Sequence, residues 1–108
     1  AFGKKAGHKK KNGVYWKKKR RDGYNMIEFR YDTQLLIEGE DLSEDDIREY
    51  ILNHFEGDCL LVVGDEELIK LHFHTNYPWQ ILEYCSTLGE IYDIVVEDMD
   101  RQARGLQG

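Results

Sequence analysis

Polar and apolar residues alternate along residues 25–37, a pattern that predicts a long strand with one buried face. The residues expected on the buried face are Ile27, Phe29, Tyr31, Thr33, Leu35 and Ile37. A second alternation runs from Leu68 to Thr75 and places Lys70, His72 and His74 on one face. Because successive side chains of a strand point to opposite faces, both histidines are expected to face away from the apolar core.

Helical periodicity and turn residues occupy the chain between these two strands. Ser43, with Asp46 three residues later, resembles a capping box, and the apolar stripe that follows predicts a helix of about three turns ending near Gly57. The apolar run 59–63 and the turn 64–67 predict a strand that forms a hairpin with the histidine strand.

A second helix and a last strand complete the order of elements. Asn76 is expected to cap the helix, with Pro78 in its first turn and Gly89 at its end. Residues 91–97 predict the last strand. The order β-α-β-β-α-β is that of an α+β, ferredoxin-like sandwich, in which a four-stranded antiparallel sheet carries both helices on one face.

This topology brings a carboxylate to the two histidines. The first and third strands are central neighbours in a ferredoxin-like sheet, so Asp32 should adjoin His72 and His74. Neighbouring strands lie about 4.8 Å apart, close enough for the three side chains to bind one zinc or other divalent ion. Two other interpretations stay open: the histidines form a solvated sheet face or a dimer contact, and Asp32 forms an ion pair with Arg30, Lys70 or a histidine.

Charge divides the chain into a basic tail and an acidic domain. Residues 1–21 carry ten Lys or Arg and no acid, whereas residues 22–108 carry five basic and 21 acidic residues. We expect a basic tail or linker over residues 1–23, one domain over 24–100 and a C-terminal tail or linker over 101–108. The basic tail can bind RNA, anionic lipid or an acidic protein surface, pair with its own acidic domain, or stay solvated. Nucleic acid is not the expected partner, because the central strands lack the aromatic stacking residues of RNA-binding sheets.

Composition limits the chain to one small domain. With 108 residues, 41% of them hydrophobic, it can supply one core. No apolar run approaches the roughly 20 residues that span a bilayer, and no signal-peptide hydrophobic region follows the lysine-rich start. Cys59 and Cys85 lack CxxC spacing and are expected to be reduced structural thiols. These features predict a cytoplasmic protein without a membrane span.

Several segments resemble the middle domain of bacterial fatty acid kinase, a dihydroxyacetone-kinase-like family. They include GDCLLVVGD at 57–65, KLHFHTN at 70–76 and LGE at 88–90. The resemblance extends over about residues 24–103 and implies a module between an ATP-binding kinase domain and a lipid-binding domain, in a cytoplasmic enzyme that phosphorylates protein-bound fatty acid. It implies kinase and lipid-binding domains or subunits as partners.

The same resemblance bears on the site. In the family, the histidines that match His72 and His74 are linked to a cysteine of the first strand, and here Asp32 stands at that position. Two histidines and an aspartate can bind zinc with one open position, although a carboxylate is a harder ligand than a thiolate. The chain has no glycine-rich phosphate loop or aspartate cluster for Mg-ATP, so we expect no ATP site and no kinase activity of its own.

The expected function is therefore that of an accessory module in a fatty acid kinase system, supporting assembly and a metal-linked site at Asp32, His72 and His74. The alternative is a non-enzymatic module that dimerises through its open sheet face and uses the basic tail to reach an acidic partner. A third hypothesis is a small metallohydrolase in which the same three residues activate water.

Overall fold

The computed structural model describes residues 8–11, 14–17 and 27–108, the first two ranges by their backbone alone. The predicted strands and helices are present in the predicted order. They are β3 (Tyr31–Glu38), α1 (Glu44–His54), β4 (Asp58–Gly64), β5 (Leu68–Thr75), α2 (Pro78–Ser86) and β6 (Glu90–Asp98). Three further elements lie outside this unit: β1 (His8–Lys11), β2 (Val14–Lys17) and α3 (Met99–Ala103).

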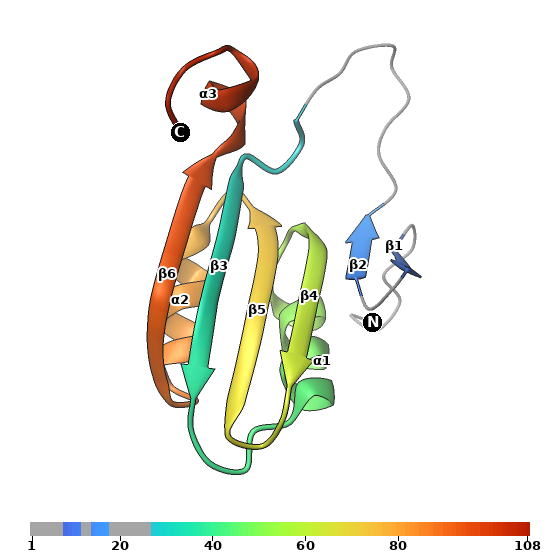
Figure 1. Cartoon of the computed structure of the whole chain (residues 1–108). Coiled ribbons are helices and arrows are strands. Elements are labelled where there is room, and N and C mark those ends of the chain that lie inside the picture. The colour runs from blue at the N-terminus through green and yellow to red at the C-terminus, as the bar shows by residue number, and fades with distance from the viewer. Residues whose placement is uncertain (1–7, 12–13, 18–26) are drawn as a thin grey trace.

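The sheet confirms the ferredoxin-like fold. Its strand order is β1-β2-β4-β5-β3-β6 with all neighbours antiparallel, and its last four strands have the ferredoxin-like arrangement with β3 and β5 at the centre. Both α1 and α2 lie on one face of these four strands (Figure 1). The opposite face is left without a helix, as predicted.

Two strands of the basic segment extend this sheet. Strand β2 pairs with β4 through Val14 opposite Leu61 and Tyr15 opposite Leu60, and β1 pairs with β2. Residues 18–26, which include most of the second basic run, lie outside the described part of the chain, as do the side chains of both strands. The hypotheses about RNA, lipid or acidic partners of the basic tail therefore stay predictions.

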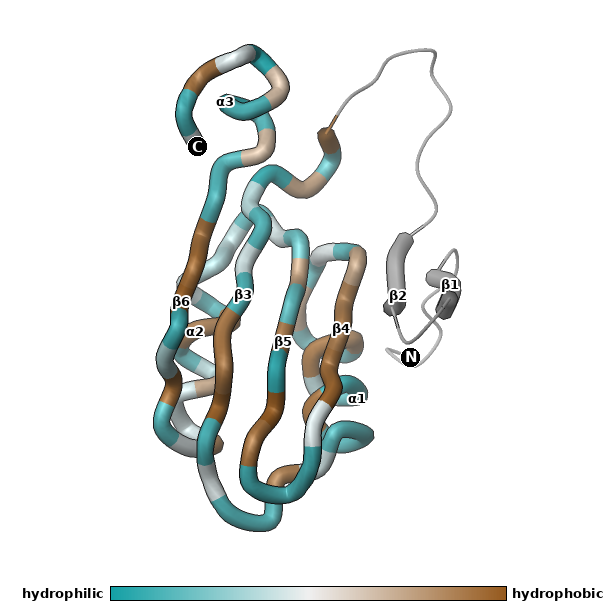
Figure 2. Tube along the Cα trace, in the orientation of Figure 1, coloured by the Kyte–Doolittle hydropathy of each residue, from teal (hydrophilic) through white to brown (hydrophobic). Residues whose placement is uncertain are grey.

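The core lies between the sheet and the two helices. Hydropathy alternates along β5 in Figure 2, because Ile69, Leu71 and Phe73 face the helices and the residues between them face away. The core residues from the other elements are Leu35, Ile37, Leu42, Ile47, Ile51, Leu60, Val62, Ile81 and Cys85. Full burial of one large apolar side chain stabilises the fold by about 1.5–3 kcal/mol, so this face fixes the orientation of every strand.

The first helix begins as predicted, whereas the second does not. The Ser43 hydroxyl accepts a hydrogen bond from the Asp46 backbone N–H at the start of α1. The predicted cap at Asn76 is wrong: Tyr77 occupies that position without a side-chain bond, although Pro78 does begin α2. The Asn76 amide instead accepts from the Arg30 N–H (2.8 Å) and donates to the carbonyl of Glu28 (3.1 Å).

The first strand of the domain is also shorter than predicted. It begins at Tyr31 instead of residue 25, because the backbone of Arg30 bonds elsewhere. Its N–H donates to Asn76 and its carbonyl accepts from the Met99 N–H at 2.9 Å. Helix α2 likewise ends earlier than expected, at Ser86 instead of near Gly89.

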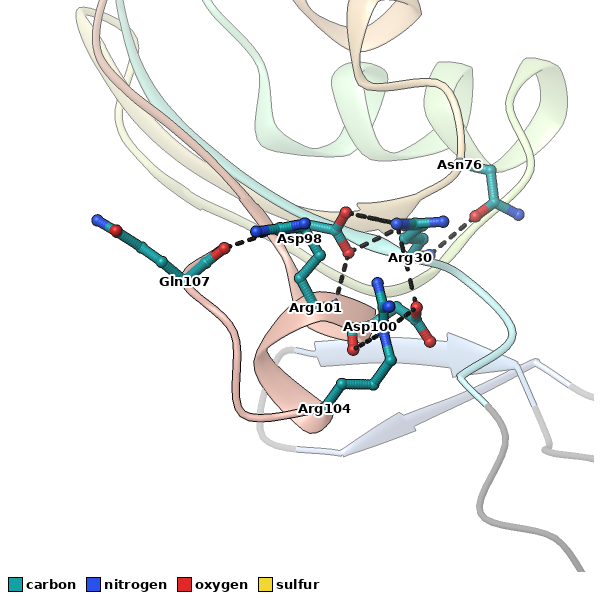
Figure 3. A network of polar contacts seen from close by, with 7 residues as sticks. All are labelled: Arg30, Asn76, Asp98, Asp100, Arg101, Arg104 and Gln107. Atoms are coloured by element: carbon teal, nitrogen blue, oxygen red, sulfur yellow. Dashed lines mark hydrogen bonds and ion pairs between the residues drawn. The ribbon is translucent and has the colours of Figure 1, made fainter.

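A polar network closes this end of the sheet (Figure 3). The Arg30 Nε donates to both carboxylate oxygens of Asp98 at 2.9 Å, and its Nη2 lies 2.8 Å from Asp98 Oδ2. Asp98 also accepts from the Arg101 N–H (3.1 Å), which caps α3. One carboxylate therefore joins the start of β3, the end of β6 and the helix that follows.

We expect Asp98→Asn to lower the melting temperature at pH 7 and to reduce its dependence on acid pH. Hydrogen bonds from Arg30 hold the pKa of Asp98 below its ordinary value of 3.8, outweighing the opposite effect of burial. The contribution of this carboxylate is therefore complete above pH 3.8 and is lost as the pH falls through the lower pKa of the folded state. Asparagine keeps the helix cap and removes only the charge.

Thermal unfolding followed by circular dichroism between pH 7 and pH 3 measures this effect. Asp100→Asn is the matched control, because Asp100 lies 4.0 Å from Arg30 and is largely exposed. Equal losses in the two variants at pH 7 would contradict the role assigned to Asp98.

Candidate metal centre

The pairing of β3 with β5 brings the three predicted site residues together. Asp32 is opposite His74, and Gln34 is opposite His72, on the face without helices. One ligand atom from each of Asp32, His72 and His74 lies within 4.8 Å of the others. A tetrahedral zinc ion with bonds of about 2.0–2.2 Å needs its N and O ligands about 3.3–3.6 Å apart, so small side-chain movements bring these donors into range.

His72 supplies a ring nitrogen with no satisfactory partner. Its Nε2 is shielded from solvent and lies 2.8 Å from Asp32 Oδ1, but it makes no aligned hydrogen bond with any group in the described part of the chain. The Gln34 amide donates to both Asp32 oxygens at 3.4 Å. A buried nitrogen that lacks a hydrogen bond is costly, and a cation between it and Asp32 would satisfy both groups.

His74 faces a different carboxylate with each ring nitrogen. Its Nε2 lies 4.0 Å from Asp32 Oδ1, and its Nδ1 lies 3.5 Å from Asp58 Oδ1. Asp58, Cys59 and His74 form a second group whose ligand atoms lie within 4.8 Å of one another. One imidazole thus belongs to two groups of potential ligands.

The two histidines differ in charge. Burial lowers the pKa of His72, an effect that the charge of Asp32 only partly offsets. Burial also lowers the pKa of His74, but hydrogen bonding to Asp58 and Cys59, together with their charges, outweighs it and raises the pKa to about 9. At neutral pH His72 is a neutral ligand, whereas a metal ion must displace a proton from His74.

Other candidates from the sequence lie away from this centre. His54 is at the exposed end of α1, where its Nδ1 is 2.9 Å from the Tyr50 carbonyl and its ring stacks on Tyr50. Arg30 pairs with Asp98, and the ion pair of Asp32 is with His72. Asp58 and Cys59 were missed as site residues, because strict alternation along β4 points Asp58 to the same side as the core residue Leu60.

Comparison with known proteins identifies the domain. The family model for the middle domain of FakA-like proteins, which are fatty acid kinase components, matches residues 28–106. The chain belongs to this family. The match confirms the resemblance read from the sequence.

The similar curated proteins are longer than this middle domain. Uncharacterized proteins from Staphylococcus aureus strains USA300, NCTC 8325 and RF122 are each 35% identical to it over 80 residues. The alignments cover 72% of this chain but 15% of each relative. No helix in the described part of the middle domain is long and apolar enough to cross a membrane.

The turn into β4 holds the His74 end of the centre. The Thr75 hydroxyl donates to the Glu56 carbonyl (2.9 Å) and accepts from the Tyr77 N–H (3.1 Å). Gly57 follows, packed so closely against β5 that a Cβ there would overlap the His74 carbonyl oxygen and the Phe73 ring. Glycine at this position therefore lets β4 approach the backbone of a proposed ligand.

We expect Gly57→Ala to destabilise the middle domain by about 1–3 kcal/mol, because the new methyl group must displace backbone as well as a core ring. Urea unfolding at neutral pH measures the change. Glu56→Ala is the control: it alters the adjacent exposed side chain and should stay within about 0.5 kcal/mol of the wild type. Equal stability of Gly57→Ala and wild type would show that the turn does not fix this approach.

Proposed function

We propose that this chain acts as the accessory middle module of a fatty acid kinase system and holds a divalent ion, zinc in the first place, through Asp32, His72 and His74. Membership of the middle-domain family supports the first part. The observation that carries the second is the gathering of three ligand atoms within 4.8 Å on two central strands, with His72 Nε2 buried and lacking a hydrogen bond.

The chemistry of the three donors fits zinc. Two imidazoles and one carboxylate are a common set for this ion, and they leave a fourth position for water or for a group from a neighbouring domain. Asp32 stands where the family resemblance implies a cysteine, so the centre should bind harder divalent ions better than a thiolate site does. Gln34 keeps the Asp32 carboxylate turned toward the histidines.

An ion at this position would connect β3 and β5 on the open face. The module would thereby present a rigid surface to the domains around it. Because the chain spans 15% of the length of the relatives it matches, we propose that kinase and lipid-binding domains or subunits supply the ATP and lipid chemistry. The module itself is proposed to contribute assembly and the metal-linked site.

Metal content tests the metal-linked part of this proposal. Untagged wild type, dialysed against metal-free buffer and analysed by mass spectrometry, should retain zinc, and His72→Ala should lose one equivalent per chain. His54→Ala removes a histidine from α1 and should retain the wild-type content. Equal zinc in wild type and His72→Ala, or none in either, would overturn the site.

A protein-interaction module is the second candidate, favoured by the edge strand β6. Four apolar residues of this strand are 37–45% exposed: Tyr92, Ile94, Val95 and Val96. The backbone of β6 pairs on one side with β3, and its other edge ends the described sheet. An exposed apolar edge of this kind is suited to strand pairing with a second chain or a neighbouring domain.

For this candidate we expect wild type to self-associate in sedimentation equilibrium and Ile94→Lys to weaken that association. Ile94 is 45% exposed on the edge strand. Leu106→Lys is the matched control, because Leu106 is 44% exposed but lies beyond the sheet. A monomeric wild type, or equal weakening by both substitutions, would remove self-association through β6.

A further inference from the structure

A β-bulge in β4 turns Asp58 toward the open face. Leu61 is opposite His72 and Asp58 is opposite His74, so two residues of β4 oppose Phe73 alone on β5. Side chains of paired residues lie on the same side of a sheet, and the extra residue therefore reverses the direction of Asp58 relative to Leu60. Without the bulge, Asp58 would point into the apolar core.

The bulge depends on an unusual backbone conformation at Cys59. Its φ of +54° lies in the left-handed region, which glycine adopts more readily than any residue with a Cβ. The described structure retains a cysteine there, half-buried and without a disulfide partner. The result is a thiol and a carboxylate from adjacent residues beside one imidazole, with Asp58 Oδ1 3.5 Å from His74 Nδ1.

We propose that Asp58, Cys59 and His74 form a second metal site, which binds Zn²⁺ or Co²⁺ through a thiolate, a carboxylate and His74 Nδ1. The donors lie within 4.8 Å of one another, and a tetrahedral ion needs them about 3.3–3.8 Å apart. A thiolate, an imidazole and a carboxylate form a set that suits borderline-soft cations. Asp58 is 7% exposed, so its charge is held close to the ion and away from competing water.

The second site shares only His74 with the site at Asp32 and His72. The His74 Nε2 faces Asp32 and its Nδ1 faces Asp58, so the ring bridges the two ions as imidazolate when both sites are filled. Each ion displaces one ring proton to solvent, and the second ion also displaces the thiol proton of Cys59. No electron transfer accompanies these steps.

Cobalt titration of the full chain tests this site separately from the first. Metal-free protein is titrated with Co²⁺ while the sulfur-to-cobalt charge-transfer band is recorded in the near ultraviolet, and bound cobalt is counted after gel filtration. Wild type should bind two ions per chain and show the band. Cys59→Ser should lose the band and one ion, His72→Ala should lose one ion and keep the band, and His74→Ala should lose both ions.

Two further variants separate ligand loss from misfolding. Cys59→Gly removes the thiol but suits the positive φ, so it should fold at least as well as wild type and still lack the band. Cys85→Ala removes the other cysteine, which is buried in the core, and should keep the band. Absence of the band in wild type, its persistence in Cys59→Gly, or its loss in His72→Ala would overturn the second site.

A failure of the second site leaves the first one measurable. One ion per chain, lost in His72→Ala and accompanied by no sulfur band, would contradict the site at Cys59 and support the site at Asp32. One ion with a sulfur band that survives in His72→Ala would support the second site and contradict the first.

Discussion

The antiparallel register between β3 and β5 is the constraint on which the fold and the candidate centre both depend. Leu35 opposite Leu71 and Thr33 opposite Phe73 point into the core, so the residues between them must point to the open face. A slip by one residue would bring the polar set into the core and expose the apolar set. Packing on the helix-covered face thus sets which groups can meet on the other face.

Local irregularity adds to this regular pairing. The bulge in β4 costs backbone strain at Cys59, of order 1–2 kcal/mol for a residue with a Cβ in the left-handed region. Burial of Leu60 and the Thr75 hydrogen bond to the Glu56 carbonyl hold the strand on either side of that residue. The surrounding structure therefore fixes a conformation that the bulged residue would not choose alone.

Partial burial gives the histidines of the open face different properties. His72 and His74 are 29% and 20% exposed, yet one lacks a full hydrogen-bond partner while the other lies beside a carboxylate and a thiol. The pKa of His72 falls and that of His74 rises for this reason. Neighbouring charges, more than depth, decide which imidazole is protonated.

The sequence by itself determined the order of elements, the core face of each central strand and the grouping of Asp32 with His72 and His74. It could do so because a period of two assigns the faces of a regular strand, and because the element order specifies which strands are neighbours. The Ser43 cap followed from a local pattern of the same kind.

Only the tertiary structure decided the role of Asn76, the ends of β3 and the position of Asp58. Asn76 bonds to the Arg30 backbone, 46 residues away in the sequence, and local capping rules cannot detect such a partner. The bulge adds one residue to β4 and reverses the alternation that sequence patterns assume, which moves Asp58 from the core side to His74. Regular periodicity can be read from a single chain, whereas a change of register depends on the strand that pairs with it.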